Sequence, residues 1–224
     1  MAKLDLMIEK LQQKLENGFK GDKTGHDFGH LKRVLKYGFY LWEQEGGDIE
    51  VIAVSCLVHD VHRLMGAREN KFIHPRESLN EVNEIISDLG LTDEQVKHIL
   101  YAVEHHEQYA FGKEKVTVKD IESKIVQDAD NLDAIGSIAI IRSFRYGTAH
   151  GMPDYLPEKP FYFSDYGEDV NDASTIHHLY NKSLRLGKYL NTASARKLAR
   201  KKTKIVKDFI ELYVQEFKGE FEES

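Results

Sequence analysis

The stretch from residue 51 to residue 60 constrains the fold of this chain more than any other part of the sequence. A run of eight largely apolar residues, Val-Ile-Ala-Val-Ser-Cys-Leu-Val, ends directly in His59 and Asp60. An imidazole and a carboxylate at the end of a buried element cost free energy unless they are paired or bound to a metal ion. The run therefore points to a functional site, although Asp60 would also suit a simple helix cap. Residue propensity leaves open whether 49–58 is a strand or a buried helix.

Length and composition restrict the number of domains, the cellular location and the class of partner. The 224 residues, 41% hydrophobic and 30% charged, favour one soluble domain with a sizeable core. No apolar stretch reaches the roughly 18 residues that span a bilayer, and the N-terminus does not resemble a signal peptide. A single cysteine, Cys56, predicts a reducing cytoplasmic location. The net charge of -6 argues against nucleic acid as a partner, and a homodimer is left open.

Apolar residues recur at helical spacing through most of the chain, so the sequence predicts a single domain over 1–224 with its core at about 20–215. Segment 62–76 is polar and rich in cations, and we expect a loop there. Segment 148–170 holds three of the four prolines and many aromatic residues, which predicts a lid-like loop, and residues 218–224 form an acidic tail. Helices are expected at 2–17, 27–45, 78–89, 118–130, 132–146, 172–190 and 194–217.

Four metal-type ligands fall near the ends of predicted helices: His30, His59, Asp60 and Asp128. The group offers nitrogen and oxygen but no thiolate, which disfavours a structural zinc site. Such a mixture suits one divalent ion, Mn, Ni, Co, Fe or Mg, with water in the open positions. Open coordination of this kind is typical of catalytic metal sites.

At these residues the chain resembles the HD-domain phosphohydrolases, whose signature is a His, a His-Asp doublet after an apolar helix, and a distant Asp. The resemblance is closest to a bacterial subgroup with the motif His-Asp-x-x-His-x-x-Arg-Val, here residues 26–34. The same subgroup carries Asp-Ala-Asp-x-Leu-Asp-Ala-Ile-Gly, here residues 128–136. The resemblance implies an all-α HD-domain helical bundle, in which 49–58 is a helix.

The resemblance also suggests roles for neighbouring residues. Some relatives carry an acidic residue three positions after the Asp of the doublet, but Arg63 stands there in this chain. Proton transfer must then come from another group, and the candidates are His105, His62 and Asp133. Substrate phosphates would be met by residues of the entry loop and of the cationic segment: His26, Asp27, Arg63, Arg68 and Lys71. The alternative role is a helix cap for Asp27 and a solvated side chain for the other four. Arg142 and Arg145 would lie about 20 Å from Asp128 along an unbroken helix.

The resemblance implies a metal-dependent phosphohydrolase that acts on nucleotides through a metal-activated water. The substrates we expect are (deoxy)nucleoside triphosphates. Two alternatives stay open. One is a non-catalytic HD module that senses a nucleotide or binds a partner. The other is a binuclear cyclic-dinucleotide phosphodiesterase, whose second ion would draw on His74, His105 and His106, although the Gly-Tyr-Pro motif of those relatives is missing here.

Overall fold

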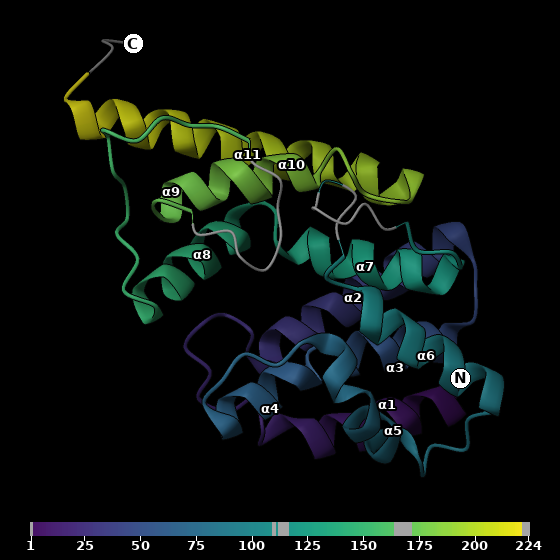
Figure 1. Cartoon of the computed structure of the whole chain (residues 1–224). Coiled ribbons are helices and arrows are strands. Elements are labelled where there is room, and N and C mark those ends of the chain that lie inside the picture. Colours follow the sequence, from purple (N-terminus) through teal and green to yellow (C-terminus); the bar gives the residue numbers. More distant parts are fainter. Residues whose placement is uncertain (1, 109–110, 112–116, 164–171, 221–224) are drawn as a thin grey trace.

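All secondary structure that the computed structural model describes is helical (Figure 1). The structure describes residues 2–108, 111, 117–163 and 172–220. This confirms the all-α expectation. The elements are α1 (Ala2–Glu16), α2 (Phe28–Glu45), α3 (Ile49–Val58), α4 (Val61–Glu69), the 3-10 turn η1 (Pro75–Ser78), α5 (Leu79–Ile86), α6 (Asp93–His105), α7 (Ile121–Asp133), α8 (Ser137–Ala149), α9 (Thr175–His178), the π-helical turn η2 (Leu179–Ser183), α10 (Leu184–Leu186) and α11 (Ala193–Lys218).

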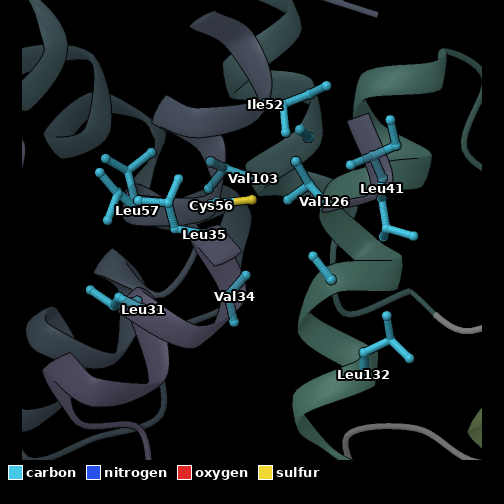
Figure 2. Packing of buried hydrophobic residues seen from close by; sticks show 14 of the residues in the cluster. Leu31, Val34, Leu35, Leu41, Ile52, Cys56, Leu57, Val103, Val126 and Leu132 are labelled. Carbon is cyan, nitrogen blue, oxygen red and sulfur yellow. The ribbon is translucent and has the colours of Figure 1, made fainter. Parts of the chain in front are cut away.

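Helix α3 is the centre of the fold. Helices α1, α2, α6 and α7 all pack against it, and every residue from Val51 to Val58 is buried. Figure 2 shows Cys56 of α3 among apolar side chains of α2, α6 and α7. A helix that is apolar on all sides needs this environment. Burial on every side explains why propensity alone did not separate helix from strand.

The N-terminal end of α3 is fixed by polar contacts. The Asp48 side chain caps the first turn, since its Oδ1 accepts from the amide N of Glu50 and of Val51 at 2.9 and 3.3 Å. The Asp48 amide donates to Oε1 of Glu122 on α7 at 2.8 Å. These bonds set the depth of α3 in the bundle, and so fix where the His59-Asp60 doublet emerges.

The helices that follow α7 form a second layer over α7 and α2. In Figure 1, α11 runs along the far side of this layer, with α9 and α10 beside it. Helix α11 contacts η2, α2, α7 and α8. Residues from the last third of the chain therefore lie next to helices of the first half.

The segment after Asp60 is helical, and the expectation of a loop over 62–76 was wrong for its first part. Residues 61–69 form α4, which ends where Asn70 adopts a left-handed conformation with φ of 51°. Leu, Met, Ala, Arg and Glu in this stretch are good helix formers. Only Val61 and His62 are buried in α4, which is why an apolar periodicity was not visible.

The expected lid at 148–170 falls partly outside the described residues, which omit 164–171. In the described part, Tyr155 is buried against α9 and α11. Its ring lies 5.6 Å from that of His177 and 5.1 Å from that of Phe217. Closure over a substrate stays a prediction.

In the described part of the chain no helix combines the length and the apolar character needed to cross a membrane. A cytoplasmic location and a homodimer stay predictions from the sequence.

Gly38 tests the close packing of α2 on α3. A Cβ atom at this position would meet Sγ of Cys56 at 2.7 Å and Cγ2 of Ile52 at 3.3 Å. We expect Gly38→Ala to lower the free energy of unfolding by about 1–3 kcal/mol in chemical denaturation, as overpacked cores do. The exposed Lys36→Ala on the same helix serves as control and should change little. In a Cys56→Ala background the Gly38→Ala cost should shrink, and equal costs in both backgrounds would contradict a direct clash.

Candidate active site

Four buried histidines gather where the C-terminal ends of α3 and α6 meet α2 and α4. Three of them place Nδ1 against a backbone carbonyl: His59 on Cys56 at 3.0 Å, His62 on His59 at 3.3 Å, and His106 on Val103 at 2.7 Å. A carbonyl oxygen only accepts, so Nδ1 carries the proton in each ring. In the neutral ring, Nε2 then presents a bare lone pair.

The fourth histidine, His30 in the first turn of α2, is held by a carboxylate instead. Its Nδ1 donates to Oδ2 of Asp133 at 2.8 Å. This is the usual second partner of a metal-binding histidine, because it fixes the tautomer and the plane of the ring. His30 thus also directs Nε2 at the cluster, where it lies 3.2 Å from Nε2 of His59.

Two carboxylates complete this first group. His30 Nε2 lies 3.4 Å from Oδ2 of Asp60 and 3.3 Å from Oδ1 of Asp130. His59 Nε2 lies 3.6 and 3.9 Å from the same two oxygens. Atoms bound to one transition-metal ion at about 2.1 Å are about 3–3.5 Å apart, so these separations suit coordination better than direct hydrogen bonds. The donor set fits a divalent ion with two nitrogens and two oxygens.

Asp128 does not belong to this group, which corrects its expected placement. Its carboxylate accepts from the amide N atoms of Asn191 and Thr192, both at 2.7 Å, and from the side chains of the same two residues at 3.0 and 2.8 Å. Helix α7 runs to Asp133, so Asp128 lies inside the helix rather than near its end. Two residues along an α-helix are about 200° apart, so Asp128 faces α11 while Asp130 faces the cluster.

His105 is also displaced from its expected position. Its ring lies 4.1 Å from that of Tyr101, with Nδ1 bonded to the Tyr101 carbonyl at 2.9 Å, and it is partly exposed. The next residue, His106, is the one that reaches the cluster, with its ring 5.0 Å from that of His59. Neighbouring side chains on a helix diverge by about 100°, and the sequence did not show which of the pair faces inward.

Asp133 acts as a fixed anchor. Besides His30, it binds Arg33 Nε at 2.8 Å through Oδ1, and Arg142 Nη1 at 2.7 Å through Oδ2. Although burial alone would raise the pKa of Asp133, the hydrogen bonds from His30 and Arg33 hold it well below the usual value. A carboxylate engaged by three donors positions its neighbours and is poorly suited to carrying protons.

The remaining expected substrate residues divide into two sets. His26 and Asp27 lie beside His30: the His26 ring is 5.8 Å from that of His30, and Asp27 caps α2 by accepting from the His30 amide at 2.9 Å. Arg63 bonds Oδ1 of Asp60 at 2.8 Å and also Glu107. In contrast, two cations of the predicted cationic segment are exposed and paired with surface glutamates: Arg68 with Glu81 and Lys71 with Glu69.

Two arginines of α8 lie close to the site, contrary to the expectation from an unbroken helix. The chain turns at Gly136, whose φ of 90° separates α7 from α8. Arg142 thereby reaches Asp133, and Arg145 reaches Oδ2 of Asp27 at 3.3 Å. The Ile-Gly-Ser sequence at 135–137 was the available signal for this break, because glycine readily adopts a positive φ.

The charges of the cluster keep its carboxylates ionised, whereas its imidazoles divide into two with a lowered pKa, His59 and His62, and two with a raised pKa, His30 and His106. Burial lowers the pKa of His59 to about 4, and burial together with Arg63 lowers the pKa of His62 to about 4. Burial raises the pKa of Asp60, but the charge of Arg63 outweighs this and holds it well below its ordinary value.

His30 is the exception among the imidazoles of the first group. Burial and the charge of Arg142 lower its pKa, but hydrogen bonds to Asp130, Asp133 and Asp60 outweigh both and raise it to about 10. The centre of the cluster therefore favours positive charge.

Sequence reasoning assigned no role to three residues at the site, Glu107, Asp130 and Lys182, and considered His106 only as a ligand of a second ion. The sequence analysis selected Asp128 instead of Asp130, and His105 instead of His106. In both pairs the rotation of the side chains around the helix determines which residue faces the cluster. Lys182 lies in the π-helical turn η2, far away in sequence. Burial lowers its pKa, while the charges of Glu107 and Asp130 oppose this shift, so its ammonium group lies within the field of the cluster.

Comparison with known proteins decides the family. The HD domain family model matches residues 27–135, from the cap of α2 to just beyond α7. An HD-superfamily hydrolase from Bacillus thuringiensis, known from its crystal structure, is 32% identical, with 97% of each chain covered and a TM-score of 0.69. The chain belongs to the HD superfamily.

Two further relatives extend this match over nearly the whole length. The uncharacterized protein YpgQ of Bacillus subtilis is 28% identical over 214 residues, which is 94% of each chain. The crystal structure of YpgQ in complex with ADP has a TM-score of 0.69 at 25% identity and covers 96% of this chain and all of YpgQ. A Listeria innocua protein is 29% identical, with a TM-score of 0.72 over 96% of this chain and 97% of that one. As an HD-superfamily member, the protein is a metal-dependent phosphohydrolase.

The role of Asp128 can be tested by stability. Asp128→Ala leaves buried donors of Asn191 and Thr192 without an acceptor, so we expect a loss of about 2–4 kcal/mol in the free energy of unfolding. Limited proteolysis should show earlier release of α11. The exposed Asp88→Ala removes only a surface pair with Lys14 and is a suitable control. Unchanged stability of Asp128→Ala would contradict the capping role.

Proposed function

We propose that this protein hydrolyses nucleotides, with (deoxy)nucleoside triphosphates as its main substrates, using a divalent ion held by His30, His59, Asp60 and Asp130. The observation that carries the proposal is the position of the Nε2 atoms of His30 and His59, which lie 3.2 Å from each other and 3.3–3.9 Å from carboxylate oxygens of both Asp60 and Asp130. A bound ion would take the place of the proton that these carboxylates favour on His30. Asp130 replaces Asp128 in this ligand set. Mn, Ni, Co, Fe and Mg remain the candidate ions.

When bound, a divalent ion supplies a nucleophilic water at neutral pH and stabilises charge on phosphoryl oxygens. The protein holds the ligands in place for this task. Asp133 fixes the ring of His30, and Arg63 fixes the carboxylate of Asp60. Of the three expected proton carriers, Asp133 is occupied by its three donors and His105 lies outside the group, so only His62 lies beside it.

The charge balance of the site supports a polyphosphate substrate. Four carboxylates (Asp60, Glu107, Asp130, Asp133) face four cationic side chains (Arg33, Arg63, Arg142, Lys182). A divalent ion then leaves the site with net positive charge, which attracts phosphate groups. The complex of YpgQ with ADP supports the nucleotide part of the proposal.

The phosphate contacts are proposed on the side of α8 and η2 rather than on the expected surface of α4. Arg142, Arg145 and Lys182 lie near the cluster or its entrance, together with His26. Guanidinium groups bind phosphate through charge-assisted hydrogen bonds. Arg68 and Lys71, which pair with surface glutamates, are assigned no contact.

The ligand set is tested by metal content. His30→Ala, His59→Ala and Asp130→Asn should each lower the affinity for Mn²⁺ in calorimetric titration by at least tenfold, because each removes one donor atom. Asp128→Asn is the matched control two residues away in the same helix, and it should bind Mn²⁺ normally while unfolding at lower denaturant. The reverse pattern, with metal lost in Asp128→Asn and kept in Asp130→Asn, would restore the original assignment.

The substrate class is tested with a nucleotide panel. The Mn²⁺-loaded protein should consume ribo- or deoxyribonucleoside triphosphates faster than cyclic dinucleotides, and a chelator should stop turnover until Mn²⁺ is restored. Separate assays for phosphate and pyrophosphate identify the bond that is cleaved. Asp60→Asn should reduce the rate by two or more orders of magnitude. Nucleotide binding without release of either product would favour the sensing module instead.

A further inference from the structure

The side chain of Gln127 on α7 joins two segments that are far apart in the sequence. Gln127 is only 6% exposed. Its Nε2 donates to the carbonyl oxygen of His105 at 3.2 Å and to that of Gln108 at 2.5 Å, and its Oε1 accepts from Nδ2 of Asn191 at 2.8 Å. One buried amide therefore ties the end of α6 to the residues that precede α11.

The neighbouring carboxylate determines which way this amide is turned. Both oxygens of Asp128 accept from backbone amides, one from Asn191 and one from Thr192. Asn191 accordingly turns Nδ2 toward Oδ1 of Asp128 at 3.0 Å, and the same nitrogen donates to Oε1 of Gln127. Nε2 of Gln127 is then left for the two carbonyl oxygens, which only accept. Both N–H groups and the oxygen of the amide are engaged.

The end of α6 depends on outside donors. The last carbonyls of a helix have no partner within it, and α6 ends at His105. Gln127 donates to the carbonyls of His105 and Gln108, which precede and follow the pair His106-Glu107 in the chain. The backbone of Glu107 is therefore held on both sides by one side chain of α7.

Glu107 is connected to a proposed metal ligand through Arg63. The guanidinium of Arg63 binds Oε1 of Glu107, and its Nε donates to Oδ1 of Asp60 at 2.8 Å. Asp60 is 1% exposed, and its Oδ2 lies 3.4 Å from Nε2 of His30. A shift of Glu107 would move Arg63 and then turn the carboxylate of Asp60 away from the other ligands. Outer contacts of this kind orient the ligands of metal sites.

We propose that Gln127 is a positioning residue that fixes the orientation of Asp60 through Glu107 and Arg63. It acts from outside the proposed ligand set, and the sequence analysis assigned it no role. The inference rests on the proposed ion at Asp60 but does not depend on which nucleotide is cleaved.

The first test compares two neighbouring residues of α7 in the full-length protein. Gln127→Met has a side chain of similar length without donors, and it should lower the Mn²⁺ affinity about 3–10-fold in calorimetric titration. Direct outer contacts are worth about 10–100-fold, and Gln127 lies further out. Asp128→Asn is the matched control, because Asp128 shares the Asn191 contact but does not bond the end of α6. It should bind Mn²⁺ normally although it is less stable.

The outcomes separate this inference from the proposed ligand set. Wild-type affinity in Gln127→Met would overturn the positioning role and leave the ligand set standing. The same loss of affinity in Asp128→Asn would also overturn it, because a general loosening of α11 would then explain both. Wild-type protein that binds no Mn²⁺ would overturn the ligand set and the positioning role together.

A second substitution keeps the test open if Gln127→Met does not fold. Gln127→Glu at about pH 8, where a carboxyl group is ordinarily ionised, keeps the acceptor for Asn191 and loses both donors. Its negative charge, one helical turn from Asp130, would by itself tighten Mn²⁺ binding. We expect weaker binding nevertheless, because the end of α6 is released. Binding as tight as that of the wild type, or tighter, would contradict the proposal.

The route through Arg63 is tested by a double-mutant cycle. Arg63→Met breaks the connection between Glu107 and Asp60, so adding Gln127→Met should then lower the Mn²⁺ affinity by less than about twofold. A further loss as large as in the wild-type background would show that Gln127 acts by another route. In the metal-free protein, the amides of residues 105–108 should exchange hydrogen faster in Gln127→Met than in Asp128→Asn. Equal exchange in the two variants would contradict the hold on α6.

Discussion

The hydrogen bonds made by the Nδ1 atoms of four buried histidines determine what this site can do. Each bond ends on an oxygen that a helix holds in place: three backbone carbonyls and the carboxylate of Asp133. Because Nδ1 carries a proton, the opposite nitrogen of each ring is the one that can donate an electron pair when the ring is neutral, and it points into the cluster. The helices therefore fix the direction in which each Nε2 atom points. Of the four acceptors only Asp133 is a side chain, and its substitution would free the ring of His30 without removing the ring itself.

Much of this arrangement was accessible from the sequence. Apolar periodicity located most of the helices, and the resemblance at residues 26–34, 59–60 and 128–136 indicated the superfamily and three of the four proposed ligands of the first ion. The superfamily and the all-α fold are confirmed, and both could be predicted because they rest on local patterns. His30, His59 and Asp60 lie at helix ends, where the neighbouring sequence shows the position plainly.

The misplaced site residues have one physical origin. The sequence did not show where each helix ends or which side of it each polar residue faces. Asp128 and Asp130 are close in sequence but face opposite sides of α7, as His105 and His106 diverge at the end of α6. The turn at Gly136 brought Arg142 to Asp133, although a continuous helix would have carried it away. Lys182 reaches the site through tertiary packing alone. Periodicity finds an apolar face, but it does not orient polar residues when nearly the whole helix is buried, as in α7.

Helix α7 carries a proposed metal ligand on one side and the anchor for α11 on the other. Asp128 holds Asn191 and Thr192, which precede the last helix, while Asp130 faces the histidines. During translation, residues 191 and 192 are added about sixty residues after Asp128. A nascent chain therefore cannot seat α7 against these partners until that later segment has left the ribosome. The helix that carries Asp130 is in this way fixed only after a much later part of the chain has been made.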